Sequence, residues 1–269
     1  MQFRYEHSSL LDANEILSTA ESLSPYVSVL RKVAEENSYT ANESSINLPF
    51  DTHLYETVLH LKEKLVTDEL EYVIVLGIGG SNLGTKAIYD ALYGYFDVIN
   101  SKRKPKLLFA DTNDPHYLQS LQAFLSQFKD TPEKILINAI TKSGTTTETL
   151  VNLEAIAECL PFEVLEKRLV ITTEHGTKLW NQAQESGIAT LEIPKKVGGR
   201  YSVLSAVGLF PLFAAGIHIR ELLDGAQVER GRCLGDDIEQ NDAALSAAIA
   251  YLHYKNEKVI NNLFLFHPE

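Results

Sequence analysis

The chain has 269 residues, of which 45% are hydrophobic and 22% are charged, and its formal net charge is -12. This composition predicts one large or two modest globular domains with a hydrophobic core. The negative charge argues against nucleic acids and membrane surfaces as partners, because both are polyanions that an acidic protein repels unless it segregates a basic patch, and we expect none.

Cys159 and Cys233 lie far apart without metal-ligand spacing, which predicts a reducing compartment and no zinc site. The N-terminal residues MQFRYEHSSL lack the apolar segment of an export signal, and no uninterrupted apolar run reaches the length of a membrane span, so we expect a cytoplasmic protein.

The first 55 residues are predicted to form a polar helical arm that ends in an irregular stretch, residues 36–52 (ENSYTANESSINLPFDT). Residues 54–66 then carry apolar side chains at helical spacing. The four that fall on one face of this expected helix are Leu54, Val58, Leu61 and Leu65. This pattern is typical of a helix that packs on a sheet.

Short apolar strands and amphipathic helices alternate through the middle of the chain. The expected strands are residues 72–76, 106–110, 134–140, 168–172 and 189–193, and the expected helices include ones that begin at Asn82, Pro115 and Thr147. This alternation predicts an α/β fold, a three-layer αβα sandwich around a five-stranded parallel sheet. Residues 201–216 are predicted to form a buried helix that is bent or broken at Pro211, two further helices are expected to end near Tyr254, and residues 258–266 read as a strand.

A cluster of hydroxyl groups lies where the third expected strand passes into a helix, at residues 138–149 (NAITKSGTTTET). The start of a helix offers free amide donors and partial positive charge, and Gly144 lets the backbone approach a ligand, so the pattern predicts phosphate binding. An alternative is a capping box formed by Thr145 and Glu148, which is compatible with phosphate binding. Lys142 could be only a solvated lysine.

The glycine-rich stretch at residues 75–84 (VLGIGGSNLG) follows the first expected strand. Asn82 stands where the dinucleotide-binding pattern requires its third glycine, and Thr85 follows Gly84 where the Walker pattern requires a lysine. The stretch therefore matches neither pattern. Gly79 and Gly80 would still bring backbone amides close to a ligand, and Ser81 could cap the helix or donate to that ligand. A tight turn that only joins strand to helix is the alternative.

A third stretch, residues 197–202 (VGGRYS), places two glycines before Arg200. Such crowding predicts an arginine delivered into a restricted place, where a fixed cation stabilises developing negative charge. A structural salt bridge is the alternative.

Together the three stretches resemble the glucose-6-phosphate isomerase family, whose sugar isomerase (SIS) domain has a GIGGS loop, an SKSGTT-like loop followed by ET, and a GGRYS segment leading into SAVGL. Here these are residues 77–81, 141–149 and 198–209. The resemblance implies reversible isomerisation of glucose 6-phosphate and fructose 6-phosphate through an enediolate, as in glycolysis and gluconeogenesis, with no cofactor or metal. It also implies a small sugar phosphate as ligand and a homodimer at full length.

Particular residues acquire roles from this resemblance. It places Arg200 beside the enediolate and Gly199 at the substrate, and it surrounds the sugar phosphate with Gly80, Ser81, Thr141, Lys142, Ser143, Thr146 and Thr149. It divides the chain into a helical arm (1–55), a first SIS domain (56–204), and a helical connector with the first strand of a second SIS domain (205–269). Thr141 in place of serine and Lys195 in place of an acidic or small residue are minor departures.

The larger departure is that the family's glutamate base, ring-opening histidine and further lysine would lie after residue 269, so the chain is expected to be an inactive N-terminal portion. Glu148, Glu174 and His175 have simpler interpretations as capping, loop and surface or packing residues. The alternatives are a stand-alone SIS module that binds sugar phosphates for regulation, and a nucleotide-dependent oxidoreductase, which Asn82 disfavours.

Overall fold

A computed structural model describes residue 5 and residues 7–256 of the chain. It divides into two compact units, residues Asn37–Asp224 and residues Met1–Glu36 with Gly225–Glu269, and the division falls within helix α10 (Ile219–Cys233). The strand expected at residues 258–266 lies outside the described residues.

The larger unit is built on a five-stranded sheet with the order β2-β1-β3-β4-β5, in which all neighbouring strands are parallel. The strands are β1 (Tyr72–Leu76), β2 (Lys106–Ala110), β3 (Ile135–Ile140), β4 (Leu169–Thr173) and β5 (Ala189–Glu192). The five strands expected from the sequence are confirmed. The chain passes from β1 to β2 on one side and then to β3 on the other, and ligands of open α/β sheets bind at such a reversal.

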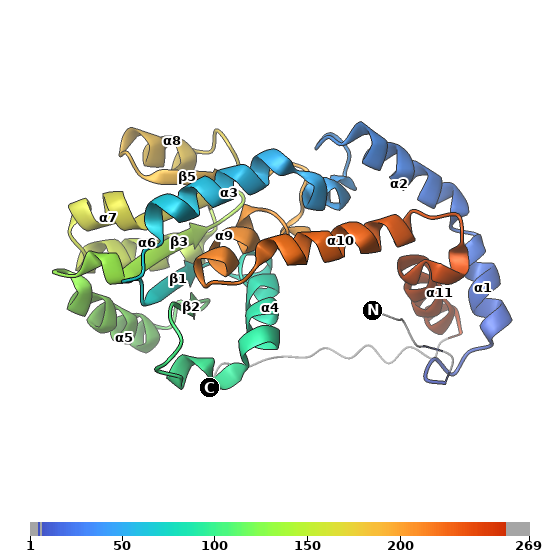
Figure 1. Cartoon of the computed structure of the whole chain (residues 1–269), viewed down its shortest axis with the longest axis horizontal. Coiled ribbons are helices and arrows are strands. Elements are labelled where there is room, and N and C mark those ends of the chain that lie inside the picture. The colour runs from blue at the N-terminus through green and yellow to red at the C-terminus, as the bar shows by residue number, and fades with distance from the viewer. Residues whose placement is uncertain (1–4, 6, 257–269) are drawn as a thin grey trace. The chain divides into compact units, whose positions relative to one another are not determined.

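Helices cover both faces of this sheet, which confirms the αβα sandwich (Figure 1). Helices α3 (Thr52–Leu65), α4 (Leu83–Tyr93) and α9 (Ala206–Ala214) contribute to the hydrophobic core on one face. Helices α5 (Pro115–Leu125), α6 (Thr147–Cys159), α7 (Phe162–Arg168) and α8 (Lys178–Glu185) contribute to the core on the other. All six residues of β3 are buried, as expected of a strand covered by helices on both sides.

The apolar face predicted for α3 is confirmed, because Leu54, Val58, Leu61 and Leu65 are all buried. The prediction of a buried helix at residues 201–216, with a bend or break at Pro211, was partly wrong. Ser205 accepts a hydrogen bond from the Val207 amide at the start of α9, so the helix begins there rather than at Tyr201. Pro211 does not break the helix, which continues to Ala214.

Short 3₁₀ turns connect several of these elements, including one where only an irregular stretch was expected. They are η1 (Ser44–Phe50), η2 (Gly79–Ser81), η3 (Tyr95–Ile99), η4 (Ser126–Phe128), η5 (Pro132–Lys134), η6 (Gly199–Tyr201) and η7 (Ile238–Gln240). Two of them, η2 and η6, lie in sequence stretches singled out above as candidate ligand loops.

The smaller unit contains helices α1 (Ala13–Glu21), α2 (Ser24–Glu36) and α11 (Asp242–Lys255), the last ending where a helix end was expected. Ile16 and Ala20 of α1 pack with Leu245 and Leu252 of α11. Arg31 of α2 donates to two backbone carbonyls and pairs with Asp236 at 2.7 Å. No helix within residues 7–256 is long and apolar enough to cross a membrane.

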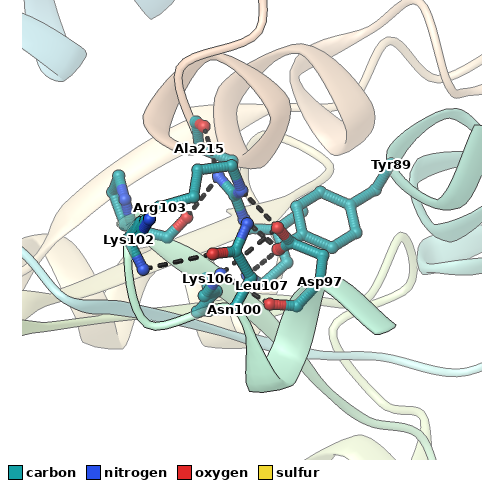
Figure 2. Close-up of polar contacts among 9 residues, drawn as sticks. Tyr89, Asp97, Asn100, Lys102, Arg103, Lys106, Leu107 and Ala215 are labelled. Carbon is teal, nitrogen blue, oxygen red and sulfur yellow. Dashed lines mark hydrogen bonds and ion pairs between the residues drawn. The ribbon is translucent and has the colours of Figure 1, made fainter. Parts of the chain in front are cut away.

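A buried ionic cluster in the larger unit joins α4, η3 and β2 (Figure 2). The Asp97 carboxylate accepts hydrogen bonds from Tyr89 Oη at 2.6 Å and Arg103 Nε at 2.6 Å, and it lies 3.2 Å from Lys106 Nζ. The Asp97 side chain is 3% exposed and that of Lys106 is 5% exposed. The Arg103 guanidinium is the main cause that holds the pKa of Asp97 well below its usual range, so the carboxylate stays ionised.

Candidate functional site

The candidate site lies at the carboxyl end of the sheet, where three loops follow buried strands. We call residues 77–82, after β1, the glycine loop, and residues 141–146, after β3, the threonine loop. Residues 198–202, which contain η6 and follow β5, are the arginine turn. Because β1 and β3 are neighbours at the reversal of strand order, the glycine and threonine loops flank the place where a ligand is expected.

The glycine loop and the arginine turn touch through their backbones. A Cβ atom placed on Gly80 would lie 2.3 Å from the carbonyl carbon of Gly199, so only glycine fits there. Ser202 Oγ lies in donor position 2.6 Å from the Gly199 carbonyl oxygen and 3.3 Å from that of Gly80. The close approach thus requires glycine at position 80, whereas a Cβ atom on Gly199 would meet only the Gly80 Cα atom, at 3.9 Å.

The glycine loop also folds against the end of β3. A Cβ atom on Gly77 would lie 3.1 Å from the Ile140 carbonyl oxygen, at the residue that precedes the threonine loop. Ser81 does not cap α4, because the helix begins at Leu83 and Asn82 occupies the cap position. Within the described residues the half-buried Ser81 hydroxyl has no hydrogen-bond partner, and both side-chain polar atoms of the buried Asn82 lack one as well.

The threonine loop is organised by bonds among its own hydroxyl groups. Thr141 Oγ1 and Thr146 Oγ1 lie 2.8 Å apart. Ser143 Oγ accepts from the Thr145 amide at 3.2 Å and from Thr145 Oγ1 at 2.9 Å, which leaves the Ser143 proton free for an external acceptor. Gly144 has a φ of +66°, a conformation that glycine adopts without strain.

The capping box expected from Thr145 and Glu148 is wrong. Thr146 is the residue before α6, and its side chain makes no capping bond, because its hydroxyl pairs with Thr141 instead. The free amides at the start of α6 therefore remain available to an anion. Thr149 in the first turn is buried, and its hydroxyl has no partner among the described residues.

Lys142 is more constrained than a solvated lysine. Its ammonium donates to the backbone carbonyl of Lys195 at 2.6 Å, and its own carbonyl accepts from the Glu174 amide at 3.0 Å. The threonine loop is thus tied to the segments after β4 and β5. The ammonium group keeps two further protons that could donate to a ligand.

Arg200 does not lie in the restricted place predicted for it. Its side chain is exposed, and its guanidinium lies 5.1 Å from the centre of the Tyr201 ring. Contact with the Tyr201 side chain raises the pKa of Arg200, so the group stays charged. Arg200 forms no ion pair with any described residue, which disfavours the alternative of a structural salt bridge.

The acidic residues and the histidine near the loops show no arrangement typical of a proton-transfer site. Glu174 lies 4.0 Å from Lys195 Nζ, and the His175 ring packs against Trp180 with 5.0 Å between ring centres. Within residues 7–256 no group of three or more His, Cys, Asp or Glu side chains is placed to hold a metal ion. What the site offers is a set of donors suited to an anion: helix amides, the Ser81 and Ser143 hydroxyls, and the Lys142 ammonium.

Comparison with known proteins identifies the family. The phosphoglucose isomerase family profile matches residues 53–262, most of the chain. The chain belongs to the phosphoglucose isomerase family. Within this family it is 41% identical over 195 residues to a glucose-6-phosphate isomerase of Carboxydothermus hydrogenoformans, covering 70% of this chain and 41% of that protein. It is 33% identical over 261 residues to the glucose-6-phosphate isomerase of Clostridium novyi, covering 92% and 57%.

Two solved structures have a similar fold. A hypothetical protein from Thermus thermophilus has a TM-score of 0.67 and 29% identity, covering 90% of this chain and 57% of that one. A glucose-6-phosphate isomerase from Chlamydia trachomatis shares the fold, with a TM-score of 0.60 at 24% identity over 74% of this chain and 37% of that one. The chain spans about half the length of the curated relatives it matches.

Proposed function

We propose that this chain supplies the phosphate-binding part of a glucose-6-phosphate isomerase, together with the arginine that stabilises its enediolate. The observation that supports this most directly is the threonine loop at the reversal of strand order. This loop combines the free amides at the start of α6, the free Ser143 proton and a positively charged residue, Lys142. Such a set of donors suits a phosphate monoester, which carries charge and several acceptor oxygens.

The role of Arg200 follows from the chemistry of aldose–ketose exchange. Moving a proton between adjacent carbons builds negative charge on an enediolate oxygen, which a nearby cation stabilises. Arg200 is charged, exposed and not engaged by a described carboxylate, and its turn touches the glycine loop at Gly80. We therefore assign Arg200 to the enediolate, and the threonine loop with Gly80, Ser81 and Gly199 to substrate binding.

The reaction also needs a base. We propose that a residue outside positions 1–269 supplies it. The family resemblance places the base in a second SIS domain, and Glu174, whose amide donates to the threonine loop, has its carboxylate 4.0 Å from Lys195 Nζ. Homodimer formation and a cytoplasmic location stay predictions.

The assignment of the base predicts that the 269-residue chain does not convert fructose 6-phosphate to glucose 6-phosphate. A coupled assay of the purified chain, with Arg200→Ala prepared in parallel, checks this. Turnover that vanishes in Arg200→Ala would contradict the prediction and place the base within these residues, with Glu148→Gln and Glu174→Gln as the next variants. Turnover equal in both preparations would come from a contaminating isomerase, and its removal should leave none.

A further inference from the structure

A cavity lies beside the edge strand β5, lined by the start of α3, by α8, and by β5 and the segment that follows it. Its volume is about 530 Å³, within the range of about 300–1,000 Å³ that is usual for small-molecule sites. The residues that decide its chemistry are Asp51, Trp180, Leu191, Glu192, Pro194 and Lys195. None of them belongs to the glycine loop, the threonine loop or the arginine turn.

The walls combine an aromatic face with polar groups that lack partners. The half-buried Trp180 lies near Leu191 and Pro194, and in the described part of the chain its indole N–H donates to no acceptor. The exposed Glu192 carboxylate likewise has no hydrogen-bond or ion-pair partner among the described residues. The cavity therefore presents the free indole N–H, the free Glu192 carboxylate and the exposed His53 side chain, which also has no described partner, beside an apolar surface.

The opposite wall is held in place by Asp51. Its carboxylate accepts from the Tyr39 hydroxyl at 2.8 Å and from the Leu54 amide at 2.8 Å. Burial, followed by the contact with Asp51, raises the pKa of Tyr39, so the phenol stays neutral and keeps donating. This wall is ordered before any ligand arrives, which lowers the entropic cost of binding.

The charges around the cavity select against anions. Asp51 and Glu192 are both acidic, whereas the one lysine of the lining, Lys195, has an 82% exposed side chain that lies 4.0 Å from Glu174. A phosphate group would therefore meet two carboxylates, and the charge of the exposed Lys195 would be screened by solvent. An uncharged ligand with hydroxyl groups avoids this repulsion.

We propose that this cavity binds an uncharged polyhydroxylated molecule of monosaccharide size. Its C–H face would lie on the Trp180 indole, one hydroxyl would donate to the Glu192 carboxylate, and another oxygen would accept from the indole N–H. The cavity is thus a sugar site separate from the threonine loop, and it takes the ligand without its phosphate.

Two contacts connect this cavity with the threonine loop. The Lys195 carbonyl in the cavity wall accepts from Lys142 Nζ. Thr177 Oγ1 accepts from the Trp180 amide at 3.2 Å, and a Cβ atom on Gly144 would lie 3.1 Å from the Thr177 side chain. Occupation of the cavity should therefore change the affinity of the threonine loop for phosphate, a consequence that rests on the proposed function of that loop.

The chain has one tryptophan, Trp180, so its fluorescence reports changes at the wall of this cavity. We expect D-glucose and D-fructose to cause a saturable change in the fluorescence of the 269-residue chain. Glu192→Gln should raise the dissociation constant about tenfold, because the hydrogen bond from the sugar hydroxyl would go to a neutral amide oxygen instead of a charged carboxylate. The exposed Glu185→Gln on α8 should leave the dissociation constant unchanged. The proposal would be overturned if the sugars caused no saturable change in fluorescence. It would also be overturned if Glu192→Gln and Glu185→Gln altered the dissociation constant equally.

The connection to the threonine loop is tested by titrating inorganic phosphate calorimetrically, with and without saturating glucose. We expect the phosphate dissociation constant to change at least twofold. Glucose binding without any effect on phosphate would overturn the coupling. Glucose binding in a chain that binds no phosphate would contradict the proposed function of the loop while supporting the sugar site, so the two failures are distinguishable.

Discussion

Replacing Asp97 with asparagine should lower the free energy of unfolding by about 3–5 kcal/mol, since it removes one partner of a buried ion pair. Arg103 and Lys106 would remain in a site where the Lys106 side chain is 5% exposed, without the carboxylate that both now face. Urea denaturation at neutral pH measures this loss. The control is Asp68→Asn, an exposed aspartate without a described partner, which should stay within about 0.5 kcal/mol of the parent chain.

The difference in stability between Asp97→Asn and the parent chain should depend on pH. Because the pKa of Asp97 is lowered in the folded chain, its contribution to stability is complete above the unfolded-state value of about 3.9 and is lost as the pH falls toward the folded-state value. The difference between the parent and Asp97→Asn should therefore be constant above about pH 5 and narrow below about pH 4. A loss under about 1 kcal/mol at neutral pH, or a gap that widens in acid, would show that the cluster is not the stabilising unit described here.

Gly80→Ala should disrupt the contact between the glycine loop and the arginine turn. The added methyl group would lie 2.3 Å from the Gly199 carbonyl carbon, so the two backbones must separate. We expect a loss of about 1–3 kcal/mol in the free energy of unfolding, the range typical of an overpacked site. Affinity for glucose 6-phosphate should also fall by about tenfold or more, because Gly80 and Ser81 lie in the part that moves.

Gly225→Ala in α10 is the matched control, because a Cβ atom there meets nothing within 4 Å. An alanine in a helix without steric conflict should raise stability by about 0.4–1 kcal/mol and leave ligand affinity alone. Urea denaturation and calorimetry on both variants separate the two cases. If Gly80→Ala behaved like Gly225→Ala, the close approach of the two loops would be wrong.

Much of the fold follows from local patterns in the sequence. The strands are short apolar runs between polar segments, and the apolar face of α3 repeats at helical spacing, so neither needs tertiary information to be recognised. The start of α9 was misplaced because Val203 and Leu204, before the helix, extend its apolar pattern toward the N-terminus. Only the Ser205 cap marks the boundary.

The site was predictable in location but not in its bonding. Glycines and hydroxyls after strands indicate a ligand loop, yet Thr145 and Glu148 match a capping box as well as they match the loop that forms. Thr141, five residues before Thr146, decides between the two, because its hydroxyl pairs with the Thr146 hydroxyl at the start of the helix. The bond from Lys142 to the Lys195 carbonyl joins residues 53 positions apart, and no local signal indicates it. The exposure of Arg200 likewise depends on how the turn packs on Gly80.

The central claim, that the threonine loop binds the phosphate of a hexose phosphate, is tested most directly by calorimetric titration of glucose 6-phosphate into the 269-residue chain. We expect saturable binding that Ser143→Ala weakens about tenfold, since the Ser143 proton is free to donate to a charged oxygen. Ser120→Ala on α5, which removes an exposed hydroxyl bonded only to its own helix, should bind like the parent chain. No binding by the parent chain, or equal affinity in both variants, would contradict the account.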